Sequence, residues 1–338
     1  MDASARIHEL EAHIRRTQME LDSLRNQLQP WETIIPAHAI DDFRQINKSI
    51  EEFCRSISES ILTQKFADVI NPTTLQLANP PLFAEAVGDC DRAPSLIMSR
   101  NEQGRPLKGV FEFGLRSIIN QNLWDLIFSL FHPSLSRKEG REVSEGLNKL
   151  YAQMRKQSSF HSYLREFYRS KHHSFFTITE TQLVSGMWRA NTFSTLDGHM
   201  KPDEIDALCS TFVDRFSANV KLLKSPKDSG RGFVLSHDER QELENIFHRA
   251  YKWNGRVNTG AVLMDFLPIL LRNNARFNSS NMVPYDDMDI PKGSSKILCA
   301  VTLGLTSSDA SKEGIEPSFV WQERVQVLTD EYFDDFQE

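Results

Sequence analysis

LKGVFEFGLRSIINQNLWDLIFSLF, residues 107–131, is the stretch of sequence that decides the expected fold. Its apolar side chains occupy most sides of a helix, which is typical of a helix buried in the centre of a domain. His132 and Pro133 follow directly, and the residue before a proline disfavours helical geometry. We therefore predict a central, buried helix that is closed by His132-Pro133.

Helical spacing continues on the C-terminal side of this stretch. Further helices are predicted at residues 142–154, 159–170, 179–189, 203–223, 237–253 and 261–273. Two beginnings are well marked, because Pro202 precedes two acidic residues and Ser236 with Glu239 has capping-box spacing. Residues 107–275 are accordingly expected to form a helical body, which is a multi-helix bundle in a mainly α protein.

On the N-terminal side, residues 31–70 are predicted to form a second long helix, and residues 71–106 a proline-rich connector. The second helix carries one apolar stripe at helical spacing, which is the pattern of a helix that buries one face. The stripe consists of Phe43, Ile46, Ile50, Phe53, Ile57 and Ile61.

Residues 1–30 have the heptad pattern of a coiled coil that begins the chain. Position a falls on Ile7, Ile14, Leu21 and Leu28, and position d on Leu10, Thr17, Leu24 and Trp31. Charges at the flanking e and g positions are attractive in a parallel dimer, and Pro30 ends the helix. The expected interface consists of Ile7, Leu10, Ile14, Leu21, Leu24 and Leu28.

These six apolar side chains need a surface to cover them. Burial stabilises each by roughly 1.5–3 kcal/mol, and a lone helix of this length is marginal in water. The cover is a second copy of the chain, another helical protein, or the chain's own body, including the apolar stripe of the second helix. Self-association as a parallel dimer is the favoured interpretation.

The C-terminal part, residues 276–338, is predicted to be a long loop followed by two strand-like runs. Apolar residues cluster at 297–303, and apolar and polar residues alternate at 319–328, as in a half-buried strand. A small C-terminal β-hairpin is therefore expected. A helix over residues 319–328 stays open as the alternative.

Composition places the protein in the cytoplasm, with the nucleus not excluded. The 338 residues carry a formal net charge of −7, which gives no electrostatic attraction for nucleic acid. The first residues contain no signal-peptide pattern, and no run approaches the ~20 apolar residues of a transmembrane helix. Cys54, Cys90, Cys209 and Cys299 lie too far apart for metal or redox spacing.

The common catalytic and nucleotide-binding motifs are missing from the sequence. We therefore predict no catalytic, cofactor-binding or metal-binding residue, and a protein that is not an enzyme. An enzyme with a site assembled from distant residues is one alternative. The favoured function is a coiled-coil interaction or scaffold protein.

A basic stretch, residues 137–173, suggests a second alternative. It holds nine Lys or Arg against four Asp or Glu, and such a surface binds acidic lipid or nucleic acid. The candidate anion-binding side chains are Lys149, Arg155, Lys156, Arg165, Arg169 and Lys171. The aromatic residues among them fall at helical spacing, so a packed aromatic face opposite a solvated basic one is the favoured interpretation.

Trp188 and Arg189, which follow Gly186, form the most distinctive motif of the helical body. Both residue types dominate binding hot spots, so a binding pocket is one interpretation. The favoured one is tight helix packing beside Gly186, with Arg189 bound to nearby carbonyl groups or to a carboxylate.

Two motifs carry a resemblance to a known family. They are Val184-Ser185-Gly186 with Trp188-Arg189, and Arg324-Val325-Gln326-Val327. In these motifs and in its layout, the chain resembles a large, uncharacterised family of proteins from mushroom-forming (basidiomycete) fungi. The resemblance implies an N-terminal coiled coil, a second long helix and an all-helical body. It implies no activity and no catalytic residue.

Overall fold

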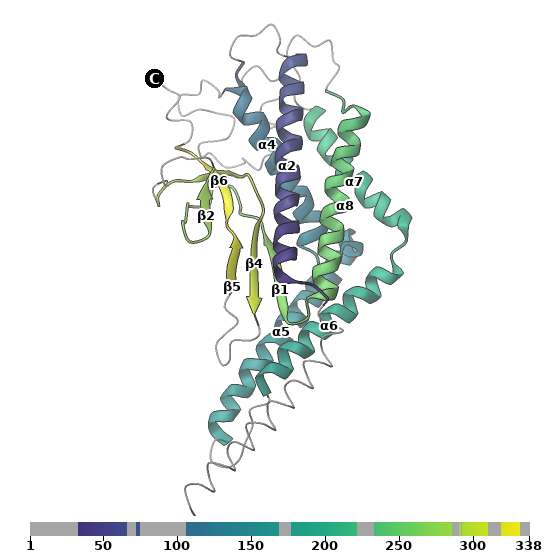
Figure 1. Ribbon diagram of the computed structural model, residues 1–338, viewed down its shortest axis with the longest axis vertical. Coiled ribbons are helices and arrows are strands. Elements are labelled where there is room, and N and C mark those ends of the chain that lie inside the picture. The colour runs from purple at the N-terminus through teal and green to yellow at the C-terminus, as the bar shows by residue number, and fades with distance from the viewer. Residues whose placement is uncertain are drawn as a thin grey trace, which may run out of the picture.

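The computed structural model describes residues 33–65, 72–74, 106–168, 177–221, 233–285, 291, 293–309 and 319–331. The predicted coiled coil, residues 1–30, and most of the predicted connector lie outside these ranges. The described part is rich in helix and carries two small β-sheets near its C-terminal end (Figure 1). The prediction of a mainly α fold with a small β part is confirmed.

The central helix of the body is α4 (Leu107–Leu123), as predicted from its apolar sequence. Its main core side chains are 0 or 1 % exposed, and they are Leu107, Phe111, Leu115, Ile118, Ile119 and Leu123. The helix continues into a π-helical turn, η2 (Trp124–Phe128), and a short 3-10 helix, η3 (Pro133–Ser136), follows. His132 caps η3, because its Nδ1 accepts a hydrogen bond from the N–H of Ser134 (3.1 Å).

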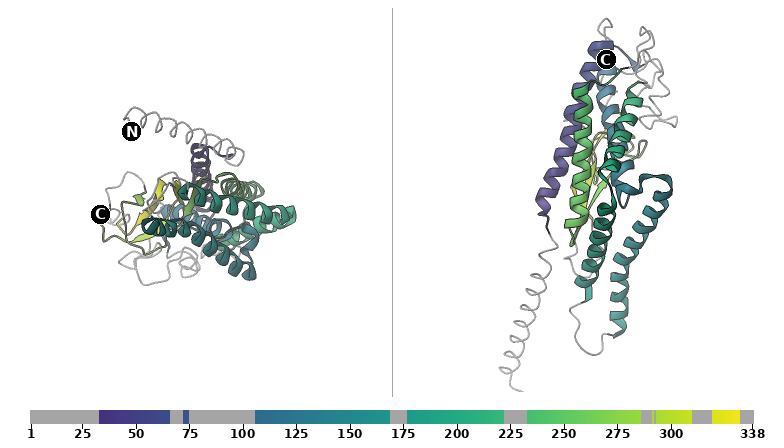
Figure 2. Two further views of the ribbon diagram at one scale, coloured as in Figure 1. Left: turned by 90° about the horizontal axis from the view of Figure 1, so that it is seen from below. Right: turned by 90° about the vertical axis from the view of Figure 1, so that its right-hand side faces the viewer.

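Helix α2 (Pro36–Lys65) packs its apolar stripe against α4 and α8 (His237–Gly260) (Figures 1 and 2). The Phe43 ring lies 4.9 Å from the ring of Trp253. The Phe53 ring lies 5.6 Å from the ring of Phe216 in α7 (Pro202–Lys221). The Nε1–H of Trp253 also donates to the carbonyl of Ala39 (2.7 Å), so the indole is both packed and hydrogen-bonded.

Helices α5 (Lys138–Tyr168) and α6 (Thr177–His199) lie side by side and extend away from the other helices (Figure 1). The helices predicted at 142–154 and 159–170 are therefore one continuous helix. The predicted capping box of α8 is confirmed, because Ser236 and Glu239 bind each other's backbone N–H (2.7 and 3.2 Å).

Two three-stranded sheets follow α8. The first has the order β1 (Met264–Ile269), β4 (Gly304–Asp309), β5 (Phe319–Glu323), and all neighbours are antiparallel. The second has the order β2 (Met282–Pro284), β6 (Val325–Thr329), β3 (Ile297–Ala300). In it β6 is parallel to β2 and antiparallel to β3.

The two sheets contain the predicted C-terminal hairpin. One arm is β3 followed by β4, and the other is β5 followed by β6. The register runs through both sheets, because Ser308 pairs with Phe319 and Ala300 pairs with Val327. Residues 319–328 are thus strands and not a helix. The structure adds β1 and β2, which convert the two halves of the hairpin into three-stranded sheets.

The helix predicted at residues 261–273 is wrong. The helices of the body end at Gly260, and residues 264–269 form strand β1. Short apolar runs do not distinguish a buried helix from a buried strand, and pairing with β4 decides in favour of the strand. Pro268 also opposes a helix here, because a proline in a helix interior removes a hydrogen bond.

Candidate functional site

The motif on α6 is built around Gly186, which touches the turn between α8 and β1. A Cβ atom on Gly186 would lie 1.9 Å from the carbonyl oxygen of Val262, so only glycine permits this approach. Two residues further on, the Trp188 ring lies 5.7 Å from the ring of Phe131 and 6.2 Å from that of Tyr151. The packing interpretation of Trp188 is confirmed, because its ring contacts aromatic rings of neighbouring elements.

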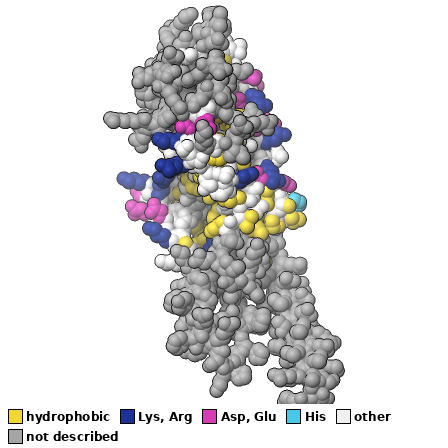
Figure 3. All heavy atoms as spheres, turned by 90° about the vertical axis from the view of Figure 1, so that its left-hand side faces the viewer, with side chains coloured by type: hydrophobic (Ala, Val, Ile, Leu, Met, Phe, Trp, Pro, Cys, Tyr) yellow, Lys and Arg dark blue, Asp and Glu magenta, His cyan; other side chains and the backbone are white. Residues whose placement is uncertain are grey.

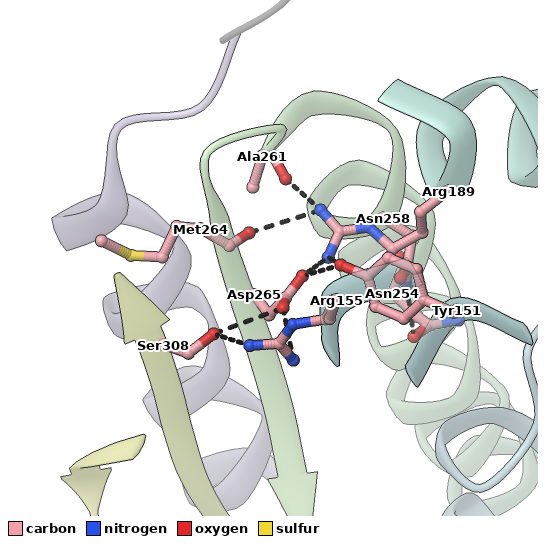
Figure 4. A network of polar contacts seen from close by, with 9 residues as sticks. All are labelled: Tyr151, Arg155, Arg189, Asn254, Asn258, Ala261, Met264, Asp265 and Ser308. Carbon is pink, nitrogen blue, oxygen red and sulfur yellow. Dashed lines mark hydrogen bonds and ion pairs between the residues drawn. The ribbon is translucent and has the colours of Figure 1, made fainter. Parts of the chain in front are cut away.

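Arg189 points toward the turn between α8 and β1 (Figure 4). It is 5 % exposed, and its guanidinium donates to the carbonyl oxygens of Ala261 and Met264 and to the carboxylate of Asp265. The prediction that Arg189 binds carbonyl groups or a carboxylate is therefore confirmed for both kinds of acceptor.

Asp265 is the centre of a buried polar group of five residues, which we name the Asp265 cluster. Its members are Tyr151, Arg155, Arg189, Asp265 and Ser308 (Figure 4). Asp265 is 1 % exposed and uses both carboxylate oxygens. Oδ1 binds Arg189 and accepts from the hydroxyl of Tyr151 (2.5 Å), while Oδ2 lies 2.8 Å from Nη1 of Arg155 and accepts from Ser308 (3.3 Å).

The Asp265 cluster places two guanidinium groups against one carboxylate. Burial lowers the pKa of Arg155, while the hydroxyl of Tyr151 acts in the opposite direction. The Arg155 guanidinium also lies 5.8 Å from the ring of Tyr151 and 5.5 Å from that of Phe319, which is cation–π geometry. Buried charges persist in proteins when they are paired and hydrogen-bonded in this way.

The Asp265 cluster joins four elements that are distant in the sequence. Tyr151 and Arg155 come from α5, Arg189 from α6, Asp265 from β1 and Ser308 from β4. The carboxylate is therefore the point at which the two-helix extension is attached to the first sheet. With every carboxylate oxygen occupied, the geometry is that of an anchor between elements.

Arg155 is a correction to the predicted anion-binding surface. Its side chain is 11 % exposed and faces Asp265, so it does not belong to a solvated basic face. Lys149 is exposed as predicted. The side chains of Lys156 and Arg165, and residues Arg169 and Lys171 entirely, lie outside the described part of the chain.

Sequence reasoning missed Asp265 and Tyr151 as members of this site. A signal was present, because Asp265 interrupts the most apolar run of the chain, residues 260–271. A carboxylate in such a run is either at a bend on the surface or buried against a cation. The sequence does not say which cation, since the partners lie 114, 110 and 76 positions away from it at Tyr151, Arg155 and Arg189.

A second polar group surrounds His132, which is 0 % exposed, while the side chain of its partner Asp197 is 49 % exposed. Its Nδ1 lies 2.8 Å from the hydroxyl of Ser134, and its Nε2 lies 3.6 Å from the carboxylate of Asp197. That carboxylate accepts a hydrogen bond from Tyr251 (2.9 Å). Burial lowers the pKa of His132, while Asp197 acts in the opposite direction.

We expect His132 to make stability depend on pH. Because its pKa is lower in the folded chain, the unfolded chain binds more protons once the pH falls to about 6.5, the unperturbed value. Stability is then lost as the pH falls through this range. His132→Asn keeps a hydrogen-bond acceptor at the cap of η3. It is expected to reduce the free energy of unfolding that is lost between about pH 7.5 and about pH 5.5. Urea unfolding at both pH values measures this free energy.

The matched control is His38→Asn, since His38 is exposed at the start of α2. It should leave the pH dependence unchanged. An equal loss of stability in wild type and His132→Asn would contradict the assignment to His132.

A cleft of about 490 Å³ lies between α2 and the junction of β5 and β6. Two of its side chains on α2 hydrogen-bond to the β segment on the other side. Arg44 donates to Glu323 (2.5 Å), and the amide of Asn47 donates to the carbonyl of Leu303 (2.9 Å) and accepts from its N–H (3.2 Å). The cleft is therefore a polar seam that holds α2 against the sheets.

No family model, curated protein or solved structure matches this chain. Within the described ranges, no cluster of three or more His, Cys, Asp or Glu side chains could hold a metal ion. Among the described helices, none has the length and apolar character needed to cross a lipid bilayer. The fold and site define a helix-rich protein with two small C-terminal sheets. A buried ionic anchor attaches the two-helix extension, α5 and α6, to the first of these sheets.

Proposed function

We propose that the protein is a non-enzymatic scaffold that self-associates through the heptad segment, residues 7–28. The observation that carries this proposal is the burial of the apolar stripe on α2. Its six side chains are 0 or 1 % exposed, and they are Phe43, Ile46, Ile50, Phe53, Ile57 and Ile61. They form one core with α4, α7 and α8.

Within the described part of the chain, the apolar stripe on α2 is the surface whose spacing was predicted to suit the heptad segment. Because it is occupied by the body's own helices, it offers no room for a further helix. The six apolar side chains of residues 7–28 still need a surface to cover them. Their burial contributes roughly 10 kcal/mol in total. A second copy supplies an equal seam with complementary flanking charges. This favours self-association over packing on α2.

Thr33, the first residue that the structure describes, is tightly packed against the end of α8. The N–H of Thr33 donates to the carbonyl of Gly260 (3.0 Å), and a Cβ atom on Gly260 would lie 2.4 Å from the Thr33 hydroxyl. Gly260 ends α8, directly before the turn that Gly186 and Arg189 contact. Two associated heptad segments would therefore hold two bodies through a short connection.

Charge in the seam is expected to abolish the dimer. Leu21→Glu with Leu24→Glu places two carboxylates at adjacent a and d positions, where an unpaired charge is costly to bury. In sedimentation or light scattering, the wild type should exceed the 38.8 kDa of one chain and the double variant should match it.

The control variant is Ser23→Glu with Asn26→Glu, which adds the same charge to the outer face of the same heptads. It should keep the wild-type mass. A wild-type chain that is monomeric at micromolar concentration would overturn the proposal, as would a seam variant that stays dimeric.

A further inference from the structure

The two sheets have four edges, and three of them are protected. Strand β1 contains Pro268, which has no N–H to offer, and its Met264 carbonyl accepts from Arg189. Strand β2 is three residues long and includes Pro284. The outer edge of β3 is paired with the chain around Ala275, since the N–H of Ile297 donates to the Ala275 carbonyl (2.8 Å). Such devices keep sheets from pairing with other chains.

Strand β5 is the exception among the described strands. Its sequence, FVWQE, contains no proline, glycine or lysine, and it pairs on one side with β4. No described residue outside β4 forms a backbone hydrogen bond with it. In Figure 1, β5 is the outermost strand of its sheet. Among the described residues, the N–H and C=O groups of its outer edge have no backbone partner.

The beginning of β5 also exposes apolar surface. Phe319 is 48 % exposed and Val320 is 47 % exposed, both well above core values. Figure 3 looks at the side of the molecule on which β5 lies and shows hydrophobic side chains gathered there among basic and acidic ones. An open strand edge with exposed apolar side chains is the usual template for β-augmentation.

We propose that β5 pairs antiparallel with β5 of a second copy of this chain, which joins the two β1-β4-β5 sheets into one six-stranded sheet. Antiparallel pairing about a two-fold axis makes the strand its own partner. It places the apolar end, Phe319 and Val320, against the polar end, Gln322 and Glu323, so the two Glu323 carboxylates lie at opposite ends. The pairing therefore brings no like charges together, and a second copy held by the heptad segments is the partner closest to this edge.

Pairing of five-residue strands buries too little area for a stable dimer, which needs about 1,200 Å² or more. The inference accordingly rests on the proposed function, because the heptad segments hold the two copies together. Tethering of this kind gives effective concentrations on the order of millimolar, at which a weak contact forms.

Spin labels on β5 test the pairing. The label is placed by Val320→Cys in a full-length chain with Cys90→Ser, since Cys54, Cys209 and Cys299 are buried. Two labelled residues on paired five-residue strands have Cα atoms within about 17 Å of each other, at ~3.4 Å per residue. We expect electron–electron dipolar spectroscopy to show this short distance in the dimer, and its loss on adding Leu21→Glu and Leu24→Glu.

A charge on the strand edge gives the second readout. Val320→Lys introduces the residue that natural edges use against pairing. The Val320→Lys chain is expected to form a weaker dimer, with a dissociation constant about tenfold higher, because it retains only the heptad contact. Val234→Lys is the control, since Val234 is 73 % exposed and lies outside the sheets; it should leave the dissociation constant unchanged.

The outcomes separate the two proposals. A dimer by mass without the short distance, or with a dissociation constant unaffected by Val320→Lys, overturns the pairing of β5 and leaves the scaffold proposal standing. A monomer by mass overturns the scaffold proposal, and the strand pairing fails with it.

Discussion

Asp265→Ala is expected to lower the free energy of unfolding by about 3–5 kcal/mol, the usual cost of breaking a buried ion pair from one side. The reason is that Arg155 and Arg189 would stay buried without the carboxylate that they share. The hydroxyl groups of Tyr151 and Ser308 would lose their acceptor as well. Urea or thermal unfolding followed by circular dichroism measures the change.

The matched control is Asp41→Ala. Asp41 pairs with Arg44 at 2.8 Å, but the two side chains are 65 % and 53 % exposed. Exposed pairs contribute about 0–1 kcal/mol, so this variant should be close to wild type. If Asp265→Ala were no more costly than Asp41→Ala, the Asp265 cluster would not be the anchor described above.

Gly186→Ala is expected to cost about 3 kcal/mol, at the upper end for an overpacked contact. The added Cβ would lie 1.9 Å from the Val262 carbonyl oxygen, which is backbone and cannot rotate away. Helix α6 or the turn would have to move, and Arg189 would be displaced from its acceptors in that turn. Denaturant unfolding measures the loss.

Gly255→Ala is the control, because Gly255 lies inside α8 and a Cβ there meets nothing within 4 Å. Alanine in an open helical position is expected to stabilise the chain by roughly 0.5–1 kcal/mol. Opposite signs for the two Gly→Ala changes would show that close approach at Gly186, and not helix propensity, sets the effect. Equal signs would contradict this account.

The sequence by itself determined most of the helices and the buried faces of α2 and α4. Residues 107–123 are apolar on most sides, and they form the central helix. The stripe from Phe43 to Ile61 has helical spacing, and it is buried as that spacing predicts. The spacing of Ser236 and Glu239 predicted the capping box that the two residues form. All these signals act within a few residues, where the helix period connects neighbours directly.

Only the tertiary structure decided where residues distant in the chain meet. In the run at 261–273 the apolar spacing does not separate strand from helix, and only Pro268 opposes a helix locally. Pairing with β4, about forty residues later, made it a strand. Arg155 belongs to a basic stretch, yet its side chain is mostly buried because it pairs with the buried carboxylate of Asp265. Burial and pairing depend on which faces of distant segments come together, and local periodicity contains no information about that choice.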